Sequence, residues 1–391
     1  MEKLKVLELF GGIGACSKAL EKLGIDYEIV DYVEIDKYAV KSFNAIHETN
    51  FNPQDICEWN KNIDVDLIMH GSPCQDFSLS GKQAGGDKGS GTRSSLMYET
   101  TRIVEKIKPK YVIWENVKNL LSKKHKHNFD AYLETMENLG YTNYYQVLNA
   151  KNYGIPQNRE RVFTVSIRND IEKDFIFPQK QELKLKLKDM LEDEVDEKYY
   201  LSEQAIIGRL TTNYQKYKLE ENLINNKDVH PTILARYEGA PTLYINNATK
   251  LGFKEAHEED SINLSYPDSK TRRGRVGKQV SQTLQCNDSI GVITNKICEL
   301  RYDEGIRTFK NDICGTIRTI EAGGNKAILN NPPLRIRKLT PKECWRLMGF
   351  DDDDFEKASK VNSNTQLYKQ AGNSIVVNIL MCIFKELLKD S

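Results

Sequence analysis

The first 170 residues alternate between short apolar stretches and amphipathic ones, and this alternation limits the fold more than any other feature of the chain. The apolar runs at 5–10 and 27–33 have the length of buried strands, and helical spacing of apolar residues follows each of them. Further strands are predicted at 65–70, 111–115 and 162–167. Strands that alternate with helices in this way form a doubly wound α/β sheet.

The rest of the chain predicts a second unit and a return to the first. A length of 391 residues is too great for one ordinary core. The charge-dense stretch 181–198 predicts a solvated helix or connector, and residues 205–334 are irregular with short β-like runs. Thr340 and Glu343 predict a capped helix start, and 367–388 predicts one long helix with an apolar face. We therefore expect the middle of the chain to be an insertion.

Composition excludes several classes of protein. The chain is 39% hydrophobic with 19 Tyr and 13 Phe, which is too apolar for a disordered protein. Its longest apolar run, residues 375–384, is about half the length of a membrane span. The eight cysteines form no CxxC pair, and the first residues show no targeting pattern, so we expect reduced thiols in a cytosolic protein. The 56 Lys+Arg balance 56 Asp+Glu, but this sum does not describe where the charges lie.

A glycine-rich turn joins the first predicted strand to the first helix. Phe10 is followed by Gly11, Gly12 and Gly14, which let the backbone approach a ligand and expose amides at a helix start. Glu34 ends the second strand, where a carboxylate can hold ribose hydroxyls, and an aspartate at Asp55 could accept an adenine amino group. The turn lacks the third glycine of a dinucleotide fingerprint. A nucleoside cofactor is favoured over a turn needed only for packing.

Reactive side chains follow the later strands. Cys74 comes directly after the strand 65–70, in a turn with a proline, where open α/β sheets place their active sites. The segment 80–91 has five glycines and predicts a mobile lid better than a disordered linker. Glu115 ends the strand 111–115 and could donate a proton, and Arg159 and Arg161 alternate on an extended segment, so that both could line the site.

The order of these motifs resembles the cytosine-5 DNA methyltransferase family, of the bacterial and phage restriction-modification type. The matching motifs are FGGIG, SPCQ, ENV, QNRER, RKLTPKECWRLMGF and QAGNS, which span residues 1–170 and 335–391. The resemblance implies a Rossmann-like, class I S-adenosylmethionine-dependent methyltransferase sheet with an inserted, irregular, mostly β target-recognition domain. It divides the chain into a catalytic and cofactor-binding domain at 1–180, the target-recognition domain at 181–334 and a C-terminal segment at 335–391 that returns to the first domain.

The resemblance also implies roles for single residues. Cys74 would add to carbon 6 of cytosine, Glu115 would protonate ring nitrogen 3, and Arg161, supported by Arg159, would hold the carbonyl oxygen. The residues that match the S-adenosylmethionine pocket are Phe10, Gly11, Gly12, Gly14, Glu34, Asp55, Asn373 and Ser374. The product would be S-adenosylhomocysteine. No metal is expected, and His125 and His127 are interpreted as part of an exposed basic turn.

DNA contacts are expected from the lid and the middle region. From 264 to 338 there are fourteen Lys/Arg against seven Asp/Glu, although the whole chain is neutral. The residues assigned to the flipped base and the DNA are Pro73, Gln75, Ser80, Lys82, Arg93, Arg272, Arg273, Arg275 and Thr283. We expect double-stranded DNA as the partner, a monomer in the bacterial cytoplasm, and a restriction endonuclease of the same system that forms no stable complex with it.

Three alternatives to this function stay open at the level of the sequence. A tRNA cytosine-5 methyltransferase shares the catalytic motifs, but the long basic middle region favours DNA. A nicotinamide-binding protein would need the complete glycine fingerprint and gives Cys74 no role. A non-catalytic DNA-binding relative is disfavoured because every motif residue is present. The recognition sequence cannot be deduced from these residues.

Overall fold

The computed structural model describes residues 3–73, 77, 90, 92–202, 243–267, 269, 271–294, 298–301, 305–308 and 335–389. The chain forms two compact units. The first comprises residues 1–185, 285–287 and 344–391, and the second comprises 186–284 and 288–343. The assignment of residues 181–334 to target recognition stays a prediction.

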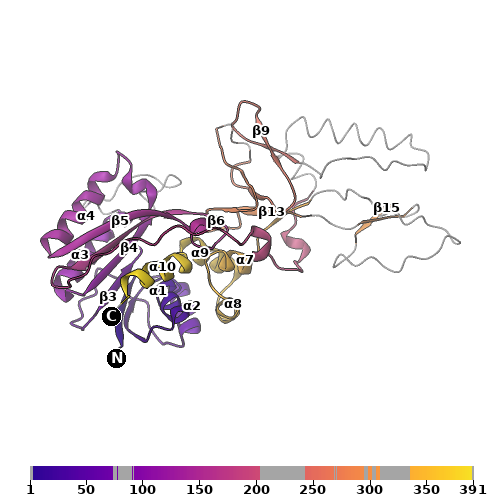
Figure 1. Ribbon diagram of the computed structural model, residues 1–391. Helices are drawn as coiled ribbons and strands as arrows, with labels where there is room; N and C mark the ends of the chain where they lie inside the picture. Colours follow the sequence, from indigo (N-terminus) through magenta and orange to yellow (C-terminus); the bar gives the residue numbers. More distant parts are fainter. Residues whose placement is uncertain are drawn as a thin grey trace. The chain divides into compact units, whose positions relative to one another are not determined.

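The first unit is built on a six-stranded sheet in the order β2-β1-β3-β4-β7-β5 (Figure 1). Strands β2, β1, β3 and β4 are parallel, β7 is antiparallel to β4, and β5 is antiparallel to β7. The strands are β1 Leu4–Leu9, β2 Tyr27–Val33, β3 Leu67–His70, β4 Tyr111–Val117, β5 Tyr141–Asn149 and β7 Glu160–Arg168, and a short strand, β6 Gln157–Asn158, precedes β7. The predicted α/β sheet is confirmed.

Helices cover both faces of this sheet. The helices of the first part of the chain are α1 Ala15–Leu23, α2 Lys37–His47, α3 Met97–Ile107 and α4 Lys126–Asn138. One core cluster joins alternate residues of the strands, such as Leu7, Leu9 and Trp114, to Ile103 of α3 and Tyr132 of α4. The residues between them, Glu8 among these, therefore point to the opposite face, since side chains alternate along a strand.

The end of α1 and the start of α7 have the residues typical of helix termini. Helix α1 ends at Gly24, whose φ of 66° is the left-handed conformation that a glycine adopts at a helix end. At α7 Pro341–Arg346, the Glu343 carboxylate accepts the backbone N–H of Thr340 at 2.8 Å, and Thr340 Oγ1 accepts that of Glu343 at 3.2 Å. This is the capping box that the sequence predicts.

The single C-terminal helix predicted at 367–388 is wrong, because two helices form. Helix α9 is Asn364–Asn373 and α10 is Val377–Leu387, and α8 Asp352–Ser359 precedes them. The Arg159 guanidinium donates to the carbonyls of Gly372 at 3.1 Å and Ser374 at 2.8 Å, which a continuous helix would use for its own bonds. The stretch Asn364–Leu387 is long and apolar enough to span a membrane by composition, but 67% of its apolar 18-residue window is buried inside the protein, as in a core helix.

The described part of the second unit consists of strands and short 3₁₀ turns. A four-stranded antiparallel sheet has the order β11-β10-β13-β16, and two hairpins are formed by β8 with β9 and by β14 with β15. The strands are β8 Leu243–Asn246, β9 Phe253–Ala256, β10 Ser261–Asn263, β11 Val276–Gly277, β12 Ser281–Gln282, β13 Ile290–Thr294, β14 Cys298–Arg301, β15 Gly305–Thr308 and β16 Arg335–Lys338.

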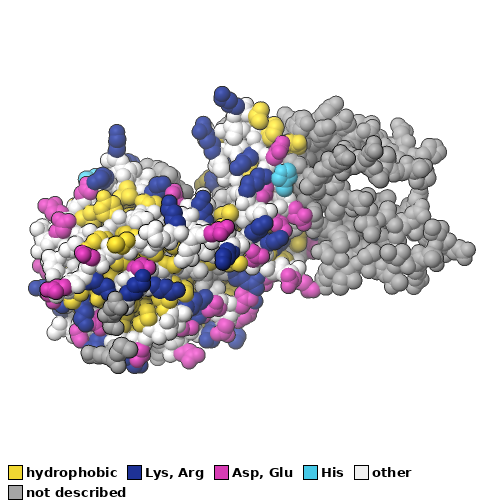
Figure 2. Space-filling model, in the orientation of Figure 1, with side chains coloured by type: hydrophobic (Ala, Val, Ile, Leu, Met, Phe, Trp, Pro, Cys, Tyr) yellow, Lys and Arg dark blue, Asp and Glu magenta, His cyan; other side chains and the backbone are white. Residues whose placement is uncertain are grey.

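The stretch 181–198 contains no α-helix, contrary to one of the two predicted possibilities. It has two 3₁₀ turns, Leu187–Met190 and Glu197–Tyr199, in an otherwise irregular connector. Leu187 and Met190 are buried, so part of this charged stretch is anchored in the second unit. Figure 2 shows basic and acidic side chains interspersed over the visible face of the described residues. Positive and negative charges therefore lie near one another on that face.

Candidate active site

The glycine turn after β1 adopts left-handed backbone conformations at three positions. Phe10, Gly12 and Gly14 have positive φ values of 52°, 57° and 81°. A Cβ on Gly11 would lie 2.6 Å from the Tyr32 ring, and one on Gly14 would collide with the His47 ring. These two glycines are therefore required by close packing. A Cβ on Gly12 would meet nothing within 4 Å, so open space lies beside this backbone.

Glu34 closes the same turn from the end of β2. Its Oε2 accepts the Gly12 N–H at 3.2 Å, and its Oε1 accepts the Asp36 N–H at 2.8 Å. Burial raises the pKa of the Glu34 carboxyl, and these backbone donors act against that shift. Open space at Gly12 beside a carboxylate acceptor suits a nucleoside with ribose hydroxyls, so these residues fit the expected cofactor. Asp55 lies in a separate turn, where its Oδ1 accepts the Cys57 N–H at 2.9 Å.

The carboxyl end of α9 carries the two other residues assigned to the cofactor. Asn373 is exposed, and its Oδ1 accepts a hydrogen bond from the Cys286 thiol at 2.9 Å. Ser374 is buried, and its hydroxyl donates to the Ile375 carbonyl at 3.1 Å. Arg159 is 2% exposed and binds the carbonyls of this corner, so its guanidinium holds the backbone beside Asn373.

Glu115 and Arg161 meet at the end of β4. The antiparallel register pairs Val117 of β4 with Arg161 of β7, and this places the Arg161 Nε 2.9 Å from the Glu115 Oε1. The side chains are 15% exposed for Arg161 and 11% for Glu115. Within the described residues, however, no hydrogen bond of good geometry reaches Glu115 Oε1. Burial raises the pKa of the Glu115 carboxyl, and the charges of Arg161 and Arg159 oppose this shift.

The turn that leads to Cys74 is fixed on both sides. Ser72 Oγ accepts the Trp114 Nε1–H at 2.9 Å and the Asn116 Nδ2–H at 3.3 Å. Beyond Cys74, Phe77 is fully buried and its carbonyl accepts the Asn119 side chain at 2.6 Å. Sequence reasoning did not single out Ser72 or Asn119. Their signal was a small polar residue beside a buried strand and an asparagine two residues after the ENV motif.

Several predicted site residues have no described side chain. Cys74, Gln75, Ser80 and Lys82 lie outside the described residues. The backbone of Arg93 begins a 3₁₀ turn, Arg93–Leu96, but its side chain is not described. Pro73 is described and half-buried. The roles of all these residues stay predictions.

The basic loop 272–275 of the second unit contains both exposed and buried arginines. Arg275 is 0% exposed, and its guanidinium donates to the carbonyls of Asn263, Ser265, Tyr266 and Pro267. The prediction that Arg275 contacts DNA does not fit this structure, because its donors already hold a loop of the protein. Arg272 lies over the Tyr266 ring at 5.6 Å, and Arg273 is exposed. Thr283 is half-buried.

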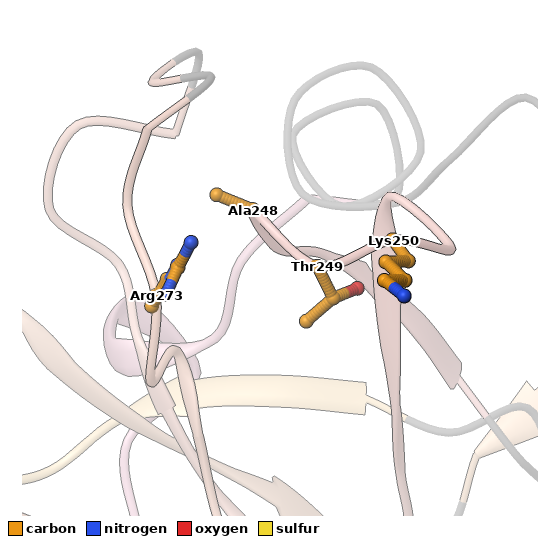
Figure 3. A pocket seen from close by; sticks show the side chains of 4 residues that line it. All are labelled: Ala248, Thr249, Lys250 and Arg273. Atoms are coloured by element: carbon orange, nitrogen blue, oxygen red, sulfur yellow. The ribbon is translucent and has the colours of Figure 1, made fainter.

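Arg273 lines a shallow hollow of about 610 Å³ with Ala248, Thr249 and Lys250 (Figure 3). The two loops that form it are joined by the Ala248 N–H, which donates to the Arg272 carbonyl at 2.9 Å. Neither Lys250 nor Arg273 has an ion-pair partner among the described residues. Within that part of the chain, the hollow therefore presents two positive charges without an acidic partner.

The expected exposure of His125 is wrong. This residue is 1% exposed and its ring packs edge-on against Phe77 at 5.3 Å, because it precedes α4 on the core side. His127 is exposed. Within the described ranges, no group of three His, Cys, Asp or Glu side chains is placed to hold a metal ion.

The sheet, the glycine turn after β1, the carboxylate at the end of β2 and the buried acid at the end of β4 define a class I methyltransferase fold. The family model of the C-5 cytosine-specific DNA methylases matches residues 4–389, and the chain belongs to this family. It is a DNA cytosine-5 methyltransferase, and its family implies S-adenosylmethionine as methyl donor. Because the matching family model describes DNA methylases, the alternative function, methylation of cytosine in tRNA, is less supported.

Named relatives cover nearly the whole chain. The chain is 35% identical to the orphan methyltransferase M.SPRI of Bacillus phage SPR, over 99% of this chain and 98% of the relative. It is 34% identical to the type II methyltransferase M2.ScrFI of Lactococcus lactis subsp. cremoris, over 99% of each. A solved methyltransferase of Entamoeba histolytica, EhMeth, shares the fold with a TM-score of 0.58 at 16% identity, covering 100% of this chain and 99% of that one.

Proposed function

We propose that this methyltransferase acts on a cytosine that leaves the DNA duplex, with Cys74 as nucleophile and Glu115 and Arg161 as the groups that bind the base. The observation that supports this proposal is the buried Glu115–Arg161 pair beside the turn that leads to Cys74. The pair holds a buried carboxyl with a raised pKa at the end of a strand, which suits a group that gives a proton to a substrate base.

The chemistry needs these side chains because carbon 5 of cytosine is a poor nucleophile. The Cys74 thiolate would bond to carbon 6, and the electron pair of the ring double bond would then make carbon 5 nucleophilic. Glu115 would give a proton to ring nitrogen 3, which its raised pKa favours, and Arg161 would bind the carbonyl oxygen. After methylation, loss of the proton from carbon 5 and cleavage of the bond to carbon 6 would release Cys74 and restore the ring.

The cofactor would be held at the ends of β1 and β2 and at the carboxyl end of α9. S-adenosylmethionine supplies an electrophilic methyl group on a sulfonium. Glu34 would accept the ribose hydroxyls, and Gly12 would let the backbone approach them. Asp55 would accept the adenine amino group. The other residues of the pocket would be Phe10, Gly11, Gly14, Asn373 and Ser374.

The target base must leave the stack, because a thiol in an enclosed site cannot reach it inside the duplex. Extrusion costs about a few kcal/mol. We assign to the lid, through Ser80, Lys82 and Arg93, the phosphate and groove contacts that offset this cost. Pro73 and Gln75 would border the extruded base, and Thr283 would lie near it.

Methyl transfer from tritiated S-adenosylmethionine to duplex DNA and to tRNA, measured side by side, tests the substrate. We expect incorporation into DNA, and activity on tRNA alone would contradict the proposal. Cys74→Ala should abolish methylation and leave DNA binding largely intact. DNA that contains 5-fluorocytosine should trap the wild-type protein covalently, because the fluorine cannot leave as the proton does. A denaturation-resistant adduct of Cys74→Ala would reject Cys74 as the nucleophile.

The hollow formed by Lys250 and Arg273 would bind DNA phosphates. Each cation that contacts a phosphate contributes about 0.9 to the slope of log K against log salt concentration. The double variant Lys250→Ala with Arg273→Ala should therefore lower this slope by roughly 2. Lys278→Ala is the matched control, because Lys278 is also exposed but is paired with Asp260 at 2.8 Å. Equal slopes for the wild type and the double variant would exclude the hollow as a phosphate site.

The biological setting follows from the relatives, which are bacterial and phage methyltransferases. We infer a monomer that acts in the bacterial cytoplasm on the nucleoid and protects DNA against a restriction endonuclease of the same system. Bisulfite sequencing of plasmid DNA methylated by this protein would give its recognition sequence. Methylation scattered without a sequence context would argue against a protective role.

A further inference from the structure

The corner at the carboxyl end of α9 is held from two sides within the first unit. On one side the Arg159 guanidinium binds the carbonyls of Gly372 and Ser374. On the other side lies the short segment 285–287, which belongs to this unit although the residues before and after it belong to the other. Its backbone lies so close to Gly372 that a Cβ there would be 2.7 Å from the Cys286 nitrogen. A side chain at Gly372 would therefore push the segment away.

The same segment determines which way the Asn373 amide faces. The Cys286 thiol donates to Asn373 Oδ1 at 2.9 Å. An amide has an acceptor oxygen and a donor NH₂ group, so a donor placed at the oxygen directs the NH₂ group to the other side. Within the described residues, the Asn373 side chain makes no other hydrogen bond. The amide orientation therefore depends on Cys286.

The protonation of Cys286 is consistent with its role as a donor. The residue is exposed overall, yet burial of the thiol raises its pKa, and the nearby charges of Arg159 and Lys369 only oppose that shift. A thiol that stays protonated at neutral pH keeps its S–H for Asn373.

We propose that Cys286 is a positioning residue for the cofactor, because its S–H holds Asn373 with the amide NH₂ group free to donate to the bound nucleoside or amino-acid part. This inference rests on the proposed function of Asn373. It adds a residue from the middle of the chain to a pocket otherwise built from its two ends.

The test compares Cys286→Ala, Cys286→Ser and the wild type in the full chain by calorimetric titration with S-adenosylhomocysteine. Loss of one hydrogen bond predicts a dissociation constant about three- to ten-fold higher for Cys286→Ala. Cys286→Ser keeps a donor and should stay within about two-fold of the wild type. In methylation assays the alanine variant should raise KM for S-adenosylmethionine and leave kcat nearly unchanged. Cys382→Ala, a half-buried cysteine in α10, is the matched control.

A second measurement tests the contact between Cys286 and Asn373 independently of catalysis. Alkylation of Cys286, followed by mass spectrometry, should slow when S-adenosylhomocysteine is bound, because a fixed Asn373 holds the thiol more firmly. Cys382 in the same digest should react at an unchanged rate. Wild-type affinity in Cys286→Ala, or equal weakening in the serine and alanine variants, would overturn the positioning role. Failure of the wild type to bind S-adenosylhomocysteine at all would instead reject the proposed cofactor site.

Discussion

Two buried glutamates on the same face of the central sheet allow a structural carboxylate to be compared with the one proposed to act in catalysis. The register places Glu8 of β1 beside Met69 of β3, and Met69 beside Ile113 of β4. Glu115 is two residues beyond Ile113, so it points to the same face as Glu8. Glu8 is 2% exposed and Glu115 is 8% exposed. In both, burial is the largest cause of a raised pKa.

The two carboxylates differ in their partners. Glu8 Oε1 accepts the backbone N–H of Ser17 at 3.0 Å and also the Ser17 hydroxyl, so it caps the first turn of α1. Glu115 instead faces Arg161 and retains an oxygen without a well-formed hydrogen bond. Burial alone therefore does not distinguish the two acids. They differ in their partners, which are a helix start for Glu8 and an arginine at a strand end for Glu115.

The largest expected effect is on catalysis at Glu115. Glu115→Gln keeps the shape of the side chain but removes the proton that the carboxyl would donate, and general acid catalysis contributes about 10²–10⁴-fold. We expect kcat to fall by that factor in methylation assays with duplex DNA. Glu8→Gln is the comparison, because its amide oxygen can still accept from Ser17, and its kcat should stay near that of the wild type. Equal losses in both variants would remove the distinction between the two acids.

The next effect is on how the free energy of unfolding depends on pH. It arises from Glu8, whose pKa rises from 4.5 to about 7 on folding. The folded protein binds this proton more tightly, so the stabilising contribution is complete below pH 4.5 and is lost as the pH rises to about 7. A shift of this size corresponds to about 3 kcal/mol. Neighbouring Cys16 and Tyr27 stay neutral in this range, since burial raises the pKa of both.

Urea unfolding of the wild type and Glu8→Gln at pH 5 and pH 8 measures this effect. Glutamine is neutral at both values, so the variant should gain stability relative to the wild type at pH 8, by up to about 3 kcal/mol compared with pH 5. The difference between the two proteins cancels the other titrating groups. A pH-independent difference would show that the Glu8 pKa is not raised.

The sequence predicts the strands of the first unit well, because their apolar composition reflects burial on both faces. Residues 27–33 were predicted as a strand, and β2 has these bounds. Strand β5 was not predicted, since it lies at the sheet edge and carries exposed polar residues. The break between α9 and α10 could not be predicted either, because apolar spacing continues through it and the carbonyls at the break are bound by Arg159, which is distant in sequence.

The candidate site was predictable residue by residue but not as a set of contacts. Glu115 was expected at a strand end and Arg161 on an extended segment, yet their contact arises because β7 runs antiparallel to β4. Arg275 was expected in an exposed basic turn, and only its bonds to four carbonyls show that it supports a loop. Sequence patterns report the environment of a residue, whereas these outcomes depend on pairs that are formed by folding.

The smallest expected effects compare two buried serines, one bonded to Glu8 and one near the strand end that carries Glu115. Ser17 is 0% exposed and bonds Glu8, and Ser72 is 3% exposed and accepts from Trp114 and Asn116 next to the turn that leads to Cys74. Either serine-to-alanine variant should cost about 1–3 kcal/mol in urea unfolding, because a buried polar group loses its partner. Only Ser72→Ala should also lower kcat, since it loosens the backbone next to the proposed nucleophile, whereas Ser17→Ala alters a helix start that the proposed chemistry does not use. If both variants retained full kcat, the hydrogen bonds of Ser72 would be purely structural, and the comparison would be confined to the two glutamates.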